Sequence, residues 1–363
     1  MLLQQRTGKM DGILLILILL LAGFGLVVLY SASAYNGQVR FRGDTAYYFK
    51  KQFWAMMLGI LILYAVSRID YHCLQGLAVP GYLLSLLLSG AVLLFGDTYN
   101  GSKRWLSIGP LSFQPSEFAK PAVILLLATF VCRLQKRKSK WSGAVVILLV
   151  LPIVGLVGTN NLSTAVIILG IAVLMIFVSN RRYLPFIWII LSGSGFLGIF
   201  LSMESYRLER LAIWRHPEAY EKGYQTMQGL YAIGSGGLFG RGLGNGLQKL
   251  GFVPEAQNDM IFSVICEEQG LIGAWLVMGM FVLLLWRLMV IATHAEDLFG
   301  ALIASGILGH IAIQAVLNIA VVTNTIPNTG ITLPFVSYGG TSVVFLLAEL
   351  GMALSVSRFG EKV

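Results

Sequence analysis

The chain has 363 residues, of which 56% are hydrophobic and 12% are charged, and its mean hydropathy is +0.78. Soluble domains carry roughly a quarter charged residues, so this composition excludes an ordinary cytosolic enzyme and indicates a polytopic membrane protein. The 26 Lys and Arg residues against 17 Asp and Glu residues give a net charge of +9. Because the basic residues are scattered through short loops, they are typical of topology signals rather than of a nucleic-acid-binding surface.

Long apolar runs predict ten membrane-spanning helices. A bilayer core about 30 Å thick requires about 20 apolar residues of helix, and the runs are continuous, without the alternation of β-barrel strands. The sequence therefore predicts an all-α integral membrane protein that forms one domain over residues 1–363. The first run, Ile13 to Leu29, lacks a small-residue cleavage site and is interpreted as a retained span. The predicted spans cover residues 12–34, 53–67, 76–96, 115–133, 142–158, 162–179, 184–203, 259–288, 297–323 and 331–356.

Lys and Arg residues near the span ends predict the orientation of the chain, because basic loops remain in the cytoplasm. Six basic residues oppose the bias without reversing it: Arg40, Arg42, Lys50, Lys51, Lys103 and Arg104. We expect a multi-pass protein with both termini in the cytoplasm. The residues that favour this orientation are Arg68, Arg133, Lys136, Arg137, Lys138, Lys140, Arg181, Arg182, Arg287, Arg358 and Lys362.

One connection is much longer than the others. Residues 204–258, between the seventh and eighth predicted spans, form a predicted extracytoplasmic loop, and a loop of this length is usually functional. A glycine-dense stretch from Gly234 to Gly251 suits close approach of the backbone to a ligand. No sustained internal repeat is found, so the sequence pointer to an inverted-repeat transporter is missing. The loop also contains the basic residues Arg207, Arg210, Arg215, Lys222, Arg241 and Lys249.

Asp259 lies where this loop enters the eighth predicted span. Aspartate is a preferred residue at the start of a helix, where it accepts backbone N–H hydrogen bonds. A partly desolvated carboxylate at a membrane boundary can instead have a raised pKa and act as a general base toward a sugar hydroxyl. The residues alone leave both interpretations open.

Further ionisable residues lie at or near span ends. Glu267 and Glu268 follow Asp259 in the same predicted helix, and groups at membrane depth usually face a bundle interior or a polar cavity. Glu117 and Lys120, three residues apart at the start of the fourth span, are expected to form a structural ion pair. Functional roles for these four residues remain the alternative.

Two other motifs carry polar groups. Lys103 and Arg104 precede the fourth span and could place donors where a lipid phosphate would lie. Ser337 belongs to Ser-Tyr-Gly-Gly-Thr-Ser, which interrupts the last span either to line a cavity or to let helices pack closely. The four histidines lack metal-ligand spacing, and the chain has no phosphate-binding loop motif for a nucleotide. The three cysteines, Cys73, Cys132 and Cys266, are too widely spaced for a metal site or a disulfide framework.

These motifs together resemble the SEDS family (shape, elongation, division and sporulation), and they follow the family order across nearly the whole chain. Two of them, Tyr30-Ser31-Ala32-Ser33 and the stretch from Asn328 to Pro334, are more similar to the FtsW and SpoVE branch. The matching stretches are Tyr30 to Ser33; Lys103 to Trp105 with Gln114 to Glu117 and Lys120; Tyr206 to Arg210; Gly223 to Gln225; Ala232 to Gly237 with Gly240 to Gly244; Pro254 to Phe262 with Glu267 and Glu268; and Leu333 to Gly340.

The resemblance implies a ten-helix peptidoglycan glycosyltransferase that joins lipid II units on the outer face of the bacterial cytoplasmic membrane. It implies that Asp259, in the Pro-Glu-Ala-x-x-Asp motif, is the general base of an inverting reaction. The implied partners are a class B penicillin-binding protein and other division or elongation proteins, with no nucleic acid. A divalent cation, Mg²⁺ or Mn²⁺, could assist departure of the diphosphate, and no nucleotide is needed. Arg207, Arg210, Lys249, Lys103 and Arg104 are candidates to stabilise that diphosphate, and Glu117, Lys120, Glu267, Glu268 and Ser337 are further substrate-binding candidates.

The chain departs from the family pattern at two positions. Asn160-Asn161 stands where relatives commonly have Pro-Asp, so a carboxylate is missing at Asn161, and Asn258 replaces a common Thr. Two other function classes remain as alternatives: a carrier that flips lipid II, and a non-enzymatic scaffold of a division complex. A carrier would concentrate ionisable residues near the bilayer midplane, whereas the sequence concentrates them in the long loop and its helix junctions.

Overall fold

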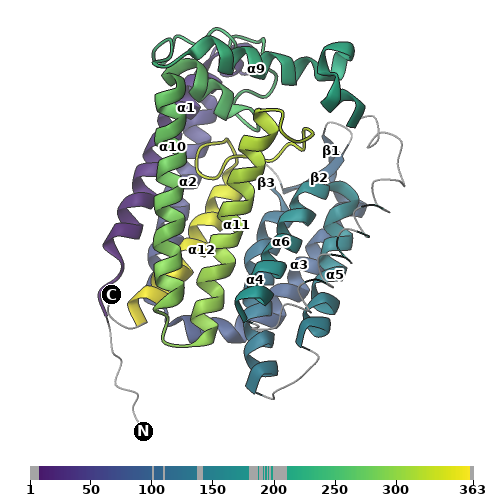
Figure 1. Cartoon of the computed structure of the whole chain (residues 1–363), viewed down its shortest axis with the longest axis vertical. Coiled ribbons are helices and arrows are strands. Elements are labelled where there is room, and N and C mark those ends of the chain that lie inside the picture. Colours follow the sequence, from purple (N-terminus) through teal and green to yellow (C-terminus); the bar gives the residue numbers. More distant parts are fainter. Residues whose placement is uncertain are drawn as a thin grey trace.

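The computed structural model describes residues 8–99, 102–108, 111–136, 142–179 and 211–359, with the isolated positions 187, 191, 193, 195 and 198. Most of the seventh predicted span, together with Arg207 and Arg210, lies outside the described residues. The described chain forms a bundle of long helices (Figure 1). These are α1 (Gly12–Arg40), α2 (Tyr47–Arg68), α3 (Ala78–Phe95), α4 (Pro115–Lys136), α5 (Ser142–Asn160), α6 (Leu162–Ser179), α10 (Ile261–Thr293), α11 (Leu298–Val322) and α12 (Gly340–Phe359).

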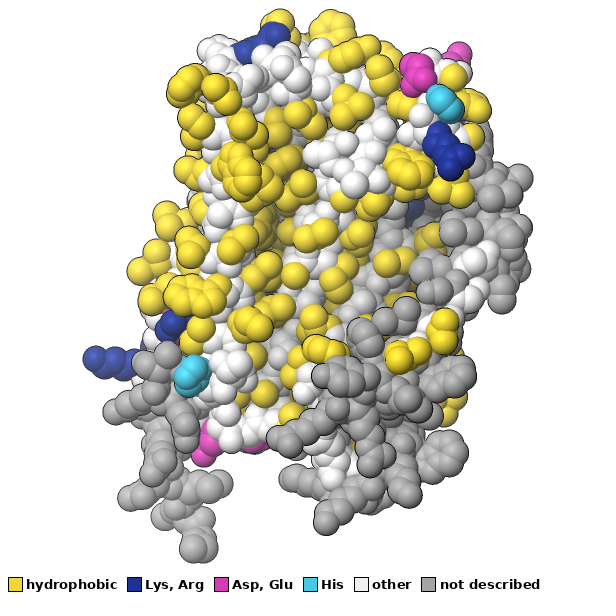
Figure 2. All heavy atoms as spheres, viewed as in Figure 1, with side chains coloured by type: hydrophobic (Ala, Val, Ile, Leu, Met, Phe, Trp, Pro, Cys, Tyr) yellow, Lys and Arg dark blue, Asp and Glu magenta, His cyan; other side chains and the backbone are white. Residues whose placement is uncertain are grey.

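The bundle is that of a multi-pass membrane protein. Within the described ranges, seven helical segments are long and apolar enough to cross a bilayer, including Tyr71–Phe95, in which the 3₁₀ helix η1 (Tyr71–Leu77) runs into α3. Figure 2 shows one face on which hydrophobic side chains cover the middle, while Lys, Arg, Asp and Glu gather toward the two ends. The count of ten spans stays a prediction.

The first and last described segments meet at one end of the bundle, which we call the terminal end. The Gly8 N–H donates to the carbonyl of Arg358 at 2.9 Å, and Arg287 of α10 pairs with Asp11 at 2.6 Å. Asp11 also caps α1 by accepting the N–H of Leu14 at 2.8 Å. The opposite end, the site end, carries a short helix, α9 (Tyr224–Gly236), and a small β-sheet (Figure 1).

The sheet corrects the all-α prediction. Strands β1 (Asp97–Tyr99), β2 (Ser102–Ile108) and β3 (Leu111–Phe113) pair antiparallel in the order β1-β2-β3 between α3 and α4. The prediction weighed only runs that could cross a membrane, and these strands are far too short for that. They fold back on one another outside the apolar runs.

The last span also begins later than predicted. Residues 331–339 are not helical, and α12 starts at Gly340 instead of Ile331. Pro334 lacks an N–H donor and disfavours a helical residue before it, and Phe335 has a left-handed φ of 66°. The freed Leu333 N–H is satisfied by the Ser337 hydroxyl at 2.8 Å.

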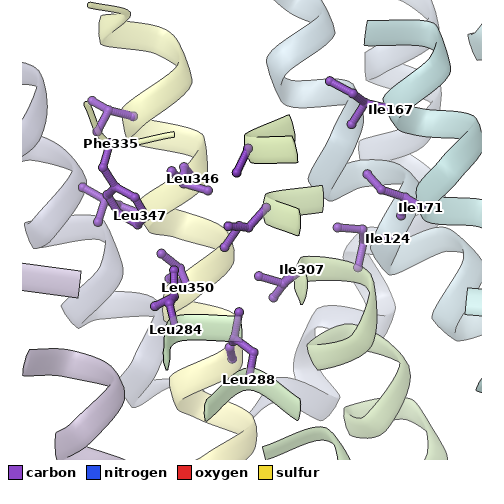
Figure 3. Packing of buried hydrophobic residues seen from close by; sticks show 14 of the residues in the cluster. Ile124, Ile167, Ile171, Leu284, Leu288, Ile307, Phe335, Leu346, Leu347 and Leu350 are labelled. Carbon is purple, nitrogen blue, oxygen red and sulfur yellow. The ribbon is translucent and has the colours of Figure 1, made fainter. Parts of the chain in front are cut away.

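The core lies where α12 packs between α2, α10 and α11. Figure 3 shows Leu346, Leu347 and Leu350 of α12 near Leu284 and Leu288 of α10 and Ile307 of α11, and all are buried. Small residues allow the closest approaches. A Cβ at Gly59 of α2 would lie 2.4 Å from a Leu347 methyl carbon, and a Cβ at Gly351 would lie 2.8 Å from the carbonyl oxygen of Leu63.

Two buried carboxylates fasten the glycine-rich segment, residues 237–252, to the site end of α10. Glu267 accepts the N–H groups of Leu247 at 2.8 Å and Gln248 at 3.2 Å. Glu268 binds the Lys249 ammonium at 2.5 Å and the Ser31 hydroxyl of α1 at 2.7 Å. The backbone of α10 departs from helical geometry at Gly270, whose φ is 66°, and its site-end part holds both carboxylates.

Breaking the Lys249–Glu268 pair on one side should destabilise the protein strongly. In Lys249→Met, an unpaired carboxylate remains at a position that is 1% exposed, which should cost about 3–5 kcal/mol. The double variant Lys249→Met/Glu268→Leu should recover much of this loss. The measurement is the monodisperse fraction after heating in detergent, and Lys50→Met, which breaks the exposed pair with Asp44, is the matched control. If Lys249→Met were as stable as Lys50→Met, the stabilising role of the Lys249–Glu268 pair would be contradicted.

Candidate functional site

Asp259 lies directly before α10, at the site end. Both of its carboxylate oxygens accept the side-chain amide of Gln225 of α9, at 3.2 and 3.3 Å. Asn328 in turn donates to Gln225 at 3.5 Å. The N-cap position of α10 is Met260, and no side chain caps the helix. The helix-cap interpretation of Asp259 is therefore wrong, and its carboxylate is held by a side chain from a different helix.

A side chain of α11 and the loop before α12 hold the backbone around Asp259. The amide of Asn318, on α11, donates to the carbonyl of Asp259 at 2.8 Å and to the carbonyl of Ile331 at 2.7 Å. The Ser337 hydroxyl donates to the carbonyl of Asn258 at 2.6 Å, and the Tyr338 N–H donates to the carbonyl of Gln257 at 2.8 Å. The segment before α10 and the segment before α12 are thereby fixed to each other.

The surroundings of Asp259 raise the pKa of its carboxyl group toward neutral pH. Burial disfavours the charged form, and the negative charge of Glu255 adds to it, so the pKa of Asp259 is raised to about 7. Hydrogen bonds from Gln225 and from backbone N–H groups oppose the shift. Glu255 is itself held in a left-handed conformation, with φ of 53°, and accepts the Asn258 amide at 2.5 Å.

A small basic pocket lies between α3, β2, α4 and α5. Lys103 and Arg104 line it beside Ser89, Ser116, Asn160 and Asn161. Arg104 donates to the carbonyl of Asn160 at 3.0 Å. The buried Ser89 hydroxyl has no hydrogen-bond partner within the described ranges. Two cations and an unpaired hydroxyl make this pocket suited to an anion.

The pocket and Asp259 are linked through one short path. The Ser163 hydroxyl of α6 donates to the carbonyl of Thr329 at 2.8 Å, and a Cβ at neighbouring Gly330 would lie 3.9 Å from an Asp259 carboxylate oxygen. Asn161 begins α6 by accepting the Thr164 N–H at 3.2 Å. The position at which a carboxylate is missing therefore has a capping role that asparagine fills as well as aspartate does.

The structure does not bring all the predicted site residues together. The three donors of Lys249 are used by Glu268, Ser31 and the carbonyl of Gly244, so in this conformation Lys249 has a structural role and no free donor for a diphosphate. Glu267 and Glu268 hold the glycine-rich segment, and Ser337 holds the loop before α12. That any of them binds substrate stays a prediction, as it does for Arg207 and Arg210.

Glu117 and Lys120 belong to a polar network inside the bundle. Lys120 pairs with Glu117 at 2.9 Å, as expected for a structural ion pair, and also donates to Gln314 at 3.0 Å. His310 contacts Gln314 at 2.9 Å and Glu349 at 2.6 Å. Because the Gln314 oxygen can only accept, His310 Nε2 is the donor in their contact.

Three residues of the site were missed by sequence reasoning: Gln225, Asn318 and Asn328. Gln225 lies in a stretch that carries the family resemblance, but a single amide in a loop has no chemical signature. Asn318 lies in an apolar run, where an uncharged polar residue usually contacts backbone in a neighbouring helix or loop.

The titration of Asp259 can be measured without turnover. Difference infrared spectroscopy should show a protonated carboxyl band, absent from Asp259→Asn, that disappears as the pH rises through about 7. Glu255→Gln removes the nearby negative charge and should lower this pKa. The matched control Glu221→Gln changes an exposed acid before α9 and should leave the band unmoved. Titration of the band near the ordinary aspartate range, about 4, would contradict the account.

Comparison with known proteins assigns the chain to a family. The family model for FtsW, RodA and SpoVE, described as "Cell cycle protein", matches residues 12–362. Stage V sporulation protein E of Bacillus subtilis is 39% identical, over 96% of this chain and 97% of that protein. A probable peptidoglycan glycosyltransferase FtsW of Trichlorobacter lovleyi is 37% identical, over 97% and 94% of the two chains.

Solved structures agree with the sequence comparisons. A chain from work described as "Structural coordination of polymerization and crosslinking by a peptidoglycan synthase complex" matches with a TM-score of 0.80 and 32% identity, over 96% of this chain and 97% of that one. The rod shape determining protein RodA of Thermus thermophilus matches with a TM-score of 0.71 and 32% identity, over 96% and 98%. The resemblance found in the motifs is confirmed: the chain belongs to the FtsW, RodA and SpoVE family of cell cycle proteins.

Proposed function

We propose that this protein is a peptidoglycan glycosyltransferase that polymerises lipid II into glycan strands, with Asp259 as its general base. The observation that carries the proposal is the state of Asp259: a carboxylate with a pKa raised to about 7, held by Gln225, whose backbone is fixed by Asn318 of α11 at the site end. A base is most effective when its pKa lies near the working pH. Relatives named as peptidoglycan glycosyltransferases support the same activity.

The proposed reaction needs one base and a stabilised leaving group. Asp259 takes the proton from the 4-hydroxyl of the acceptor sugar, whose oxygen then attacks the anomeric carbon of the donor from the side opposite the diphosphate. The new glycosidic bond forms as the bond from that carbon to the diphosphate oxygen breaks, so the configuration inverts and undecaprenyl pyrophosphate leaves. In this proposal Gln225 orients the base, and Lys103 and Arg104, which line the basic pocket, stabilise the departing negative charge.

We derive no step through a metal held by the protein. In the part of the chain that the structure describes, no group of three or more His, Cys, Asp or Glu side chains could hold a metal ion. Assistance from Mg²⁺ or Mn²⁺ stays a prediction.

The topology and the partner belong to the same proposal. Ten spans follow if residues 184–203 form the seventh, which leaves the site end outside the cytoplasm and both termini inside. The similar solved chain comes from a complex described as coordinating polymerization and crosslinking. We infer that this protein likewise works with a class B penicillin-binding protein that crosslinks the product. Relatives named FtsW and Stage V sporulation protein E support a role in division or sporulation.

A lipid II carrier is the second candidate, and one observation favours it. Four ionisable side chains, Glu117, Lys120, His310 and Glu349, are buried inside the bundle, where a carrier would place its working groups. These groups are paired with one another rather than directed at a pathway. The candidate base lies at the site end, which favours chemistry on one face.

Polymerisation of labelled lipid II by the purified protein, with its cognate penicillin-binding protein, tests the proposal. Wild type should produce long glycan strands, and Asp259→Asn should slow polymerisation by on the order of 10²- to 10⁴-fold, because general base catalysis contributes this much. The matched control is Asp70→Asn, in which asparagine can keep the cap that Asp70 gives to η1.

Binding of the partner and a monodisperse elution profile establish that Asp259→Asn is folded. Equal polymer from wild type and this variant would reject Asp259 as the base. Absence of polymer from both, together with transbilayer movement of fluorescent lipid II in proteoliposomes, would favour the carrier.

A further inference from the structure

The glycine-rich segment has its polarity reversed relative to a loop that faces water. Lys249 points inward and pairs with Glu268; the two residues are 5% and 1% exposed. Six large apolar side chains point outward, of which Phe239 is 79% exposed and Leu238 is 61% exposed. We call these six the apolar patch: Leu238, Phe239, Leu243, Leu247, Leu250 and Phe252. A patch of this kind marks an interaction site.

Several backbone N–H groups of the segment donate to α10 rather than to solvent. Glu267 accepts the N–H groups of Leu247 and Gln248 through its side chain, and the N–H of Arg241 through its carbonyl at 3.0 Å. The Gly242 N–H donates to the carbonyl of Glu268 at 2.8 Å. A buried carboxylate is not required as the acceptor for these N–H groups where water can accept them, whereas next to hydrocarbon an acceptor from the protein is needed.

The depth of the segment can be counted along two helices. The Asp11–Arg287 ion pair joins the start of α1 to α10 near the terminal end and serves as the reference level. Ser31, which binds Lys249, lies about 30 Å along α1 from Asp11, at about 1.5 Å per residue. Gly270 lies about 26 Å along α10 from Arg287. Since the hydrocarbon core is about 30 Å thick, the segment sits at its boundary on the site end.

The apolar patch also continues the lipid-facing surface of α10. The N–H groups of Leu271 and Ile272 donate to the carbonyls of Gly237 at 3.0 Å and Leu238 at 3.2 Å, which joins the segment to the helix. Leu271, Ile272 and the next outward-facing residue, Trp275, are exposed apolar side chains of the membrane-spanning part. The ends of α1, α9 and α10 lie together here (Figure 1), and Figure 2 shows hydrophobic side chains continuing up to the site end.

We propose that the apolar patch inserts into the outer leaflet of the bilayer, with lipid acyl chains as its partner. The glycine-rich segment is then an interfacial anchor. Because the segment is bound to α10 through Glu267 and Glu268, the anchor sets the height of the site end, and with it Asp259, relative to the membrane surface. The assignment to the outer leaflet rests on the topology proposed above, whereas membrane insertion of the patch does not depend on the proposed reaction.

Nitroxide accessibility in proteoliposomes of phosphatidylethanolamine and phosphatidylglycerol tests the anchor. A spin label at Phe239→Cys is measured in a Cys73→Ser background, because Cys132 and Cys266 are buried. The label should collide readily with oxygen and poorly with a water-soluble nickel chelate, as does a label at Leu276→Cys on the exposed face of α10. A label at Glu221→Cys, which is exposed before α9, is the water reference and should show the opposite preference.

The ratio of oxygen to nickel accessibility at Phe239 should resemble that at Leu276 and exceed that at Glu221 several-fold. A ratio like that of Glu221 would overturn the proposal. Low accessibility to both reagents, with or without spin–spin broadening, would also overturn it, because it would show that protein covers the patch. Leu243→Cys supplies an independent position, and lipid exposure there with water exposure at Phe239 would likewise count against insertion.

Discussion

The site end depends on two carboxylates buried in α10. Glu267 and Glu268 are 0% and 1% exposed, and burying them without partners would cost several kcal/mol each. Each has a compensating set: backbone N–H groups for Glu267, and Lys249 with Ser31 for Glu268. These contacts bring α1, α10 and the glycine-rich segment together. They also explain why the bend at Gly270 persists, since the segment is bonded to both sides of it.

The contacts of Glu267 and Glu268 at the site end of α10 also help to position Asp259. The residue stands two places before α10, so the orientation of that helix end sets where its backbone lies. Asn318 and Ser337 then fix the adjoining loops, and Gln225 reaches the carboxylate from α9. None of these partners is charged. A base held by neutral amides keeps a high pKa, because a cation at the same place would stabilise the carboxylate and weaken it as a proton acceptor.

Much of this architecture was predictable, and the failures have physical causes. Span positions follow from run lengths, because lipid demands about 20 apolar residues of helix. The start of α12 was misplaced because hydropathy does not register the loss of helix at Pro334. Lys249 was expected to meet a diphosphate, and only the fold shows that Glu268 takes its charge. A loop lysine gives no sequence signal of its partner when the two are distant in the chain.

Asp259 was found from its place at a loop–helix boundary and from the family resemblance, whereas its environment was not. Gln225 comes from α9 and Asn318 from α11, on opposite sides of Asp259 in the sequence. Such contacts depend on how the helices pack. Local patterns therefore indicate the candidate base but not the groups that would orient it.

The most direct test of this account is the pH dependence of lipid II polymerisation, compared with the infrared titration of Asp259 in the same preparation. A base must be ionised to accept a proton, so the rate should rise with pH through about 7, the value to which the pKa of Asp259 is raised. In Glu255→Gln, the rate midpoint and the infrared midpoint should move down together. A rate that is flat across this range, or a midpoint that stays while the carboxyl titration shifts, would contradict the account.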